Sequence, residues 1–292
     1  MAMNVDRYIS RAHDFGISEE LIEKSLNKMA AKLKTSGRWS EAARALRVAK
    51  ASSSLLIEAY SKAGEWMNAV EVAERTKEMS SIKGLLVDRA HTMIKEFADR
   101  SEQFHSHTKR LGVVRDIKKE RIINVKEGIE NGGDLEAADL FSEAGSTYSI
   151  ASRKTGKTGI DRKKQSLKEG GEYEDSALLL ALAAHYKWMD EITAELVQLL
   201  PALVHTDEIA LASSVQNAAE QFFDDLVTSR SRIWPNKLHP WDLPGPIYAL
   251  YTINDVFTFP ADGGMPEVVT LEPEIVAPTL DTNRKWKLQI LS

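Results

Sequence analysis

The most chemically distinctive part of this sequence is a cluster of basic side chains between positions 153 and 168. Seven cations lie there against one acidic residue, Asp161, although the 292-residue chain has a net charge of −5. A cationic segment that is rich in Gly, Ser and Thr can bind phosphate groups through counterion release, without a shaped pocket. We expect a phosphate-contacting arm; the alternative is a solvated linker or a sorting signal. The seven cations are Arg153, Lys154, Lys157, Arg162, Lys163, Lys164 and Lys168.

No group of residues in the sequence predicts catalysis. The chain has no cysteine, which excludes disulfides, thiolate zinc sites and a cysteine nucleophile. His105 and His107 are two residues apart, so their rings diverge on a helix and make a poor metal pair. The segment 151–158 resembles a phosphate-binding loop, but it begins with alanine in place of the first glycine and follows no predicted strand. We predict a protein that is not an enzyme and that binds neither a cofactor nor a metal.

Proline divides the chain into a helical part and an irregular tail. All nine prolines lie at or beyond Pro201, and eight of them fall between Pro235 and Pro278. An interior proline costs a helix about 3 kcal/mol. The chain before the prolines can therefore be helical throughout, whereas the segment from Ile233 to Ser292 favours extended chain and turns.

A short repeat marks the beginning of the helical part. The pattern Gly-x-Trp-x-x-Ala occurs at Gly37–Ala42 and again at Gly64–Ala69, 27 residues apart. In stacked helix pairs of the tetratricopeptide (TPR) type, such a glycine ends one helix, the tryptophan fills the seam and the alanine allows close approach. The alternative is two similar hairpins without a wider array. Residues 81–126, interrupted by only two glycines, predict one long helix or two nearly collinear ones.

A regular apolar seam lies further along the chain. Eight positions from Leu178 to Leu203 alternate at spacings of 4 and 3, which is typical of a coiled coil or of a bundle core. The stretch Ala177–Ala184 is apolar on every face, so the helix has surplus surface to cover. We expect three short helices, with a break near Trp188–Asp190, that self-associate; the alternative is an intramolecular bundle capped by the long helix and the tail. The predicted dimer interface comprises Leu178, Leu179, Leu182, Met189, Ile192, Leu196, Leu199, Leu203, Trp286 and Leu288.

These patterns predict an all-α fold. Residues 1–127 form a TPR-like α-solenoid end and a long helix, residues 128–171 a flexible acidic-then-basic linker, and residues 172–292 a small helical dimerisation domain with an irregular, Pro-rich C-terminal tail. No apolar run approaches the roughly 18 residues that span a bilayer, and the first residues lack an apolar signal core. We expect a soluble protein of the cytoplasm, with the nucleus as a further compartment, and no membrane partner.

Several segments, taken in order, resemble a known family. They are His107–Lys118 (HTKRLGVVRDIK), Asp139–Glu143 (DLFSE), Arg162–Gly170 (RKKQSLKEG) and Trp286–Leu291 (WKLQIL). The chain beyond about Ser101 resembles the C-terminal region of the largest, scaffolding subunit of the Elongator complex, also called IKAP. The basic motif RKKQSLKEG and the C-terminal motif WKLQIL, taken together, are specific for this family.

The resemblance implies a non-catalytic role. In that family the large subunit holds the complex together, its C-terminal region homodimerises, and the complex modifies the wobble uridine of tRNA with the catalytic groups in a different subunit. It implies that the seven cations contact tRNA, and that the partners are a second copy, other Elongator subunits and tRNA. This sequence departs from relatives in that Gly156, Gly159, Ile160 and Asp161 dilute the basic run, which weakens the expected RNA contact. The alternative function is a helical-repeat, protein-binding adaptor whose basic linker is only a spacer or sorting signal.

Overall fold

The computed structural model describes residues 5–130, 167–171, 173–245, 257–258, 267–268, 275–281 and 285–291. These residues are helical or irregular apart from one pair of two-residue strands, β1 (Phe257–Thr258) and β2 (Glu267–Val268), which run antiparallel. Two short 3-10 helices, Pro240–Asp242 and Gln289–Leu291, follow the last α-helix. The predicted all-α class is confirmed.

Contacts divide the chain into two compact units, each assembled from discontinuous segments. The first unit comprises Met1–Ala98, Asp190–Phe222 and Asp281–Ser292, and the second comprises Asp99–Met189 and Phe223–Leu280. Three long helices, α6 (Met79–Glu130), α9 (Glu174–His205) and α10 (Ile209–Ile233), contribute residues to both units. The three sequence ranges 1–127, 128–171 and 172–292 stay a prediction, since most of the middle range lies outside the described residues.

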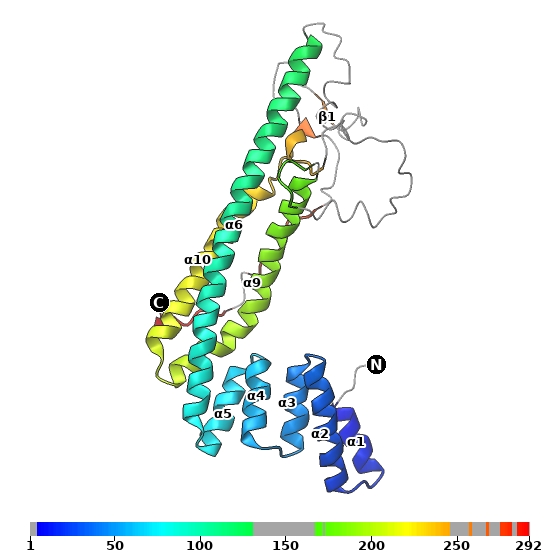
Figure 1. The fold of residues 1–292 in the computed structure, drawn as a ribbon, viewed down its shortest axis with the longest axis vertical. Helices are drawn as coiled ribbons and strands as arrows, with labels where there is room; N and C mark the ends of the chain where they lie inside the picture. Colours follow the sequence, from blue (N-terminus) through cyan, green and yellow to red (C-terminus); the bar gives the residue numbers. More distant parts are fainter. Residues whose placement is uncertain are drawn as a thin grey trace. The chain divides into compact units, whose positions relative to one another are not determined.

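The first unit begins with a stack of short helices. They are α1 (Val5–Asp14), α2 (Glu19–Thr35), α3 (Trp39–Val48), α4 (Ser53–Lys62) and α5 (Trp66–Thr76). α2 packs against α3, α3 against α4, and α4 against α5. Successive hairpins therefore lie side by side (Figure 1). This is the arrangement that TPR-like repeats produce.

The Gly-x-Trp-x-x-Ala pattern marks equivalent points of two hairpins. Gly37 and Gly64 both have a φ of +73°, a left-handed conformation that glycine adopts without strain and that ends a helix. Trp39 and Trp66 begin α3 and α5. The alanines three residues after them are fully buried, which lets the neighbouring helices approach closely. The predicted roles of the glycine and the alanine are confirmed.

The long helix is continuous. α6 runs from Met79 to Glu130 without interruption, as the first of the two predicted alternatives has it. Apolar side chains at spacings near 3.6 residues form one face of α6. Most of them are buried, and Ile94 is half-buried. The buried members are Leu86, Ala90, Met93, Phe97 and Phe104.

The predicted break near Trp188–Asp190 is wrong, because α9 is a single helix from Glu174 to His205. In the second unit, the hydroxyl of Tyr186 donates to the carbonyl of Leu226 on α10 at 2.7 Å. The ring of Phe104, on α6, packs edge-on against Tyr186 with centroids 6.3 Å apart. In the first unit, the rings of Phe97 on α6 and Phe222 on α10 pack with their centroids 6.2 Å apart. The three helices that pack together are therefore α6, α9 and α10. The sequence pattern instead predicts three short helices, all of them after the linker.

The end of the chain packs along α10 in the first unit. The side-chain amide of Gln216 holds the backbone of Leu288 twice: the Leu288 N–H donates to Oε1 at 2.8 Å, and Nε2 donates to the Leu288 carbonyl at 3.4 Å. Lys287 pairs with Glu220 at 3.4 Å. Trp286 is buried, and so is Leu291. The last described residues therefore form an irregular strap on the helix.

Candidate functional site

Most of the predicted phosphate-contacting arm lies outside the described residues. This is the case for Arg153, Lys154, Lys157, Arg162, Lys163 and Lys164. Lys168 is described, and its side chain is exposed to solvent. The residues that follow Lys168 connect the arm to the second unit.

Arg110 on α6 ties the end of the arm to the start of α9. Its guanidinium pairs with Glu169 at 2.6 Å and makes two hydrogen bonds to Glu174, at 2.5 and 3.0 Å. The Gly170 N–H also donates to Glu174, at 2.7 Å. Burial alone would raise the pKa of Glu174, but these donors outweigh it, and the pKa lies below its ordinary value. A charged Glu174 thus fixes the chain within two residues of Lys168.

The predicted dimer-interface residues are placed differently from what the seam suggested. All of them except Leu288, which is half-buried, are buried within a single chain. Within the single chain the seam side of α9 is buried, whereas Leu180, in the stretch that is apolar on every face, is 41% exposed. Self-association itself stays a prediction, and any contact with a second copy needs side chains that point outward.

A buried charge cluster links three distant segments of the second unit. Lys118 on α6 is only 7% exposed, and its ammonium donates to the carboxylate of Asp175 at the start of α9. It also donates to the carbonyls of Leu243 and Gly245, at 2.9 and 2.6 Å. The Gly245 N–H donates in turn to Asp175 at 3.0 Å. Burial lowers the pKa of Lys118, and the Asp175 carboxylate opposes that shift. The cluster fixes the segment after α10 that contains Leu243 and Gly245, here called the proline-rich loop, onto α6 and α9.

A second cluster, in the first unit, centres on Glu195 of α9. Arg89 of α6 donates to it with two nitrogens, each at 2.8 Å, and the indole N–H of Trp66 donates to it at 3.0 Å. A Cβ placed on Gly64 would lie 3.4 Å from the Glu195 side chain. The carboxylate of Glu195, with that of Glu96, raises the pKa of Arg89. Glu195 therefore joins the second Gly-x-Trp-x-x-Ala repeat to α6 and α9, a role that the sequence pattern gave no means to predict.

Among the residues that the structure describes, the histidines do not form a metal site. The rings of His107 and His185 lie 6.0 Å apart, and His185 also packs edge-on against Phe104. Burial, and secondarily the charge of Arg100, lowers the pKa of His185 to about 4, so this side chain is neutral near pH 7. In the described part of the chain, no three His, Asp or Glu residues are close enough to hold a metal ion. No helix there is both long and apolar enough to cross a membrane.

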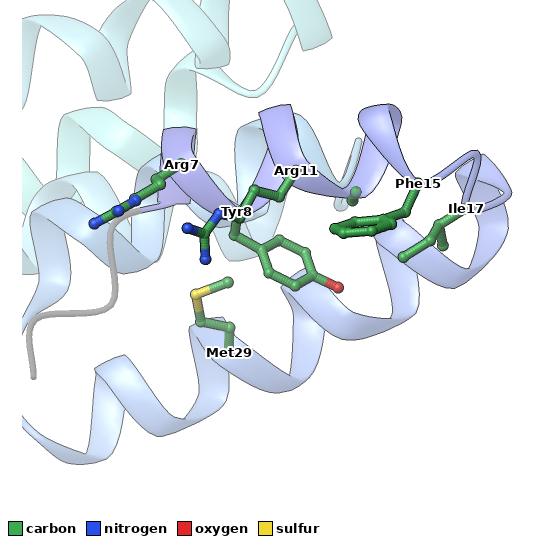
Figure 2. A pocket seen from close by; sticks show the side chains of 7 residues that line it. Arg7, Tyr8, Arg11, Phe15, Ile17 and Met29 are labelled. Carbon is green, nitrogen blue, oxygen red and sulfur yellow. The ribbon is translucent and has the colours of Figure 1, made fainter.

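An apolar pocket of about 380 Å³ lies between α1, α2 and the turn that joins them (Figure 2). The rings of Tyr8 and Phe15 and the thioether of Met29 line it, together with Arg7 and Arg11. The Phe15 side chain is 81% exposed. Exposed apolar patches of this kind mark protein-interaction sites.

The geometry defines a class of protein: an all-α protein in which stacked helical hairpins are followed by three long helices, two of which, α6 and α9, are joined by ion pairs that are buried or partly buried. A family profile described as the ELP1 three-helix bundle matches residues 78–233, the span of α6, α9 and α10. The chain belongs to this Elongator ELP1 family, and the resemblance drawn from its motifs is confirmed.

Individual relatives agree with the family. The "Putative elongator complex protein 1" of Xenopus laevis is 30% identical over 233 residues, which cover 73% of this chain and 19% of the frog protein. Elongator complex protein 1 of Schizosaccharomyces pombe is 29% identical over 174 residues, which cover 53% of this chain and 14% of the yeast protein. The rat protein of the same name is 24% identical over 233 residues. This chain thus spans less than a fifth of the length of the curated relatives that it matches.

Proposed function

We propose that this chain is a non-catalytic scaffold segment of the Elongator complex, which homodimerises and carries a basic arm that contacts tRNA during wobble-uridine modification. The observation that carries the proposal is the family match over residues 78–233. It is supported by the architecture, in which buried ion pairs hold α6, α9 and the proline-rich loop as a fixed body. A scaffold needs such fixed geometry because it positions other subunits.

Homodimerisation is tested by the mass of the chain in solution. Because the seam residues are buried, the contact must use outward apolar side chains, and Ile290 in the C-terminal strap is 73% exposed. In an interface of standard size, such side chains at the centre supply most of the binding free energy. Analytical ultracentrifugation of the 292-residue chain is expected to give a dimer. A mass of one chain at high concentration contradicts this part of the proposal.

Changing Ile290 to glutamate is expected to weaken the dimer and to leave the fold intact. A charge at the centre of an interface is desolvated on association, whereas in the separate chain it stays in water. The dimer dissociation constant should rise at least tenfold, with the thermal midpoint nearly unchanged. Lys285→Glu, on an exposed residue of the same strap, serves as the control for charge alone. Equal effects of both variants on the dissociation constant would reject Ile290 as a contact.

The RNA contact is tested by neutralising part of the arm. We expect the variant Lys163→Gln/Lys164→Gln/Lys168→Gln to bind tRNA roughly 10- to 100-fold more weakly at moderate salt, because each lost phosphate contact removes one counterion-release contribution. The slope of log affinity against log salt should fall by roughly 2–3. Fluorescence anisotropy with labelled tRNA over a salt series measures both quantities. Unchanged affinity and unchanged slope would exclude the arm from RNA binding.

A further inference from the structure

A groove of about 660 Å³ in the second unit has no role in the function proposed above. It lies between α6, the last turn of α10 and the 3-10 helix Pro240–Asp242, whose Trp241 lines it. Residues of α6 at positions 105, 109, 112, 116 and 119 contribute to its wall. Their spacings of 4, 3, 4 and 3 place them on one face of the helix. The groove therefore follows the axis of α6.

The charges in the groove are unequal. Four cationic side chains line it, those of Lys109, Arg115, Lys119 and Arg232, against the two carboxylates of Asp116 and Asp242. The chain as a whole is acidic, with a net charge of −5. The groove therefore has a local positive charge on an acidic protein.

One of the four cations is already occupied. Arg115 pairs with Asp242 at 3.3 Å and donates to the carbonyls of Arg232 and Ile233, at 3.0 and 2.8 Å. These bonds satisfy the carbonyls at the C-terminus of α10. Arg115 therefore builds the wall of the groove and is not available to a ligand.

The other three cations are available. Within the described part of the chain, no carboxylate forms an ion pair with Lys109, Lys119 or Arg232. The Lys119 ammonium lies 5.4 Å from the centre of the Trp241 ring, which holds it at the groove. Lys109 and Arg232 are exposed. The groove thus presents three cations against one uncommitted carboxylate, Asp116.

A glycine leaves the middle of the groove open. Gly112 lies on α6 between Lys109 and Lys119, and a Cβ at this position would meet no atom within 4 Å. A ligand can therefore approach the helix backbone there. A larger side chain at position 112 would therefore narrow the groove without changing any charge.

The length of the groove decides the class of ligand. Ten residues of α6 separate Lys109 from Lys119, which corresponds to about 15 Å along the helix axis at 1.5 Å per residue. Both lysine side chains would have to extend toward each other to reach one phosphate, which would remove the Lys119 ammonium from the Trp241 ring. A row of phosphates can contact each ammonium where it lies. We infer that this groove, between α6 and the end of α10, is a second RNA-binding surface that contacts the sugar–phosphate backbone. The inference rests on the proposed function, because RNA is its ligand, but it concerns residues other than the arm.

The first test removes the charge. In the full 292-residue chain, Lys109→Gln/Lys119→Gln/Arg232→Gln is expected to reduce the affinity for tRNA roughly 10- to 100-fold at moderate salt and to lower the salt slope by roughly 2–3. The control variant Lys24→Gln/Lys28→Gln/Lys62→Gln removes three exposed lysines from the helical hairpins of the first unit. It should leave the slope unchanged. Equal losses in both variants would overturn the inference, because they would report net charge alone.

The second test blocks the groove and keeps every charge. Gly112→Met places a flexible side chain in the open middle of the groove and is expected to weaken tRNA binding roughly tenfold. Gly84→Met is the matched control, since Gly84 lies on the same helix and also has open space around a Cβ. Both changes should raise helix stability, because glycine is a poor helix former. An affinity that falls equally in both variants, or in neither, would overturn the inference.

The failures of the two proposals can be told apart. If only the arm variant loses affinity, the proposed function stands and the groove inference is wrong. If only the groove variants lose affinity, the groove inference stands and the arm is wrong. Two further probes address the ligand class: polyglutamate and vesicles of anionic phospholipid. Binding of either probe as tightly as tRNA, with the same loss in Gly112→Met, would assign the groove to acidic proteins or to membranes and overturn the RNA assignment.

Discussion

Replacing Lys118 with methionine is expected to destabilise the chain by about 3–5 kcal/mol, the range found when one partner of a buried ion pair is removed. The methionine fills nearly the same volume, so the loss comes from charge and hydrogen bonding. Asp175 would keep its buried carboxylate without the ammonium, and the carbonyls of Leu243 and Gly245 would lose their donor. The proline-rich loop should then detach from the helices.

Denaturant unfolding followed by circular dichroism measures the free energy of unfolding of this variant. Lys119→Met is the control, since it removes the next lysine, which is not buried, and should cost less than about 1 kcal/mol. Adding Asp175→Asn to Lys118→Met should recover part of the loss, because the buried charge is then removed. Equal stability of Lys118→Met and Lys119→Met would show that the cluster does not stabilise the fold.

The second large effect is expected at Glu195. Its replacement by alanine should cost about 2–4 kcal/mol, since it removes a bidentate bond to Arg89 and the acceptor of the Trp66 indole. The loss should be smaller than for Lys118, because the Glu195 and Arg89 side chains are about one-fifth exposed and water can replace part of the interaction.

Hydrogen exchange can localise this effect. Faster amide exchange in α5 and in the first turns of α6 is expected for Glu195→Ala, because these elements lose their connection to α9. Glu195→Gln keeps an acceptor for Trp66 but not the charge, so its effect should be about half as large. Glu191→Ala, one turn earlier on an exposed position of the same helix, is the control. Exchange that is unchanged in α5 would show that Glu195 does not hold the repeat in place.

The amino-acid pattern predicts much of this fold because helix formation is local. Absence of proline, the repeated Gly-x-Trp-x-x-Ala and the apolar spacing identify the helices and their buried faces. The partner of a buried face is not a local property. The seam from Leu178 to Leu203 indicates that one side of α9 must be buried. One of the helices that pack against α9 is α6, which ends more than forty residues earlier in the chain. The pattern therefore identifies the buried face but not the helix that packs on it, and self-association stays a prediction.

The basic run on α6 illustrates the same limit for the candidate sites. In the sequence, Lys109, Arg110, Arg115, Lys118 and Lys119 are equivalent members of one cationic stretch. In the structure the helix distributes them over different faces, so that Arg110, Arg115 and Lys118 pair with carboxylates from other segments. Only Lys109 and Lys119 among these five point to the groove without an ion pair in the described residues. Periodicity could have separated the faces, but the carboxylates that meet them lie too far away in sequence to be assigned.

The two turn glycines are equal in backbone conformation but unequal in surroundings. Gly37 has open space where a side chain would begin, so an asparagine or aspartate, which tolerate the left-handed region, can replace it at modest cost. Gly64 has the same φ and, in addition, the Glu195 side chain at contact distance. A substitution at position 64 therefore carries the same backbone strain as one at position 37 and also brings its Cβ into van der Waals contact with the side chain that accepts hydrogen bonds from Arg89 and Trp66.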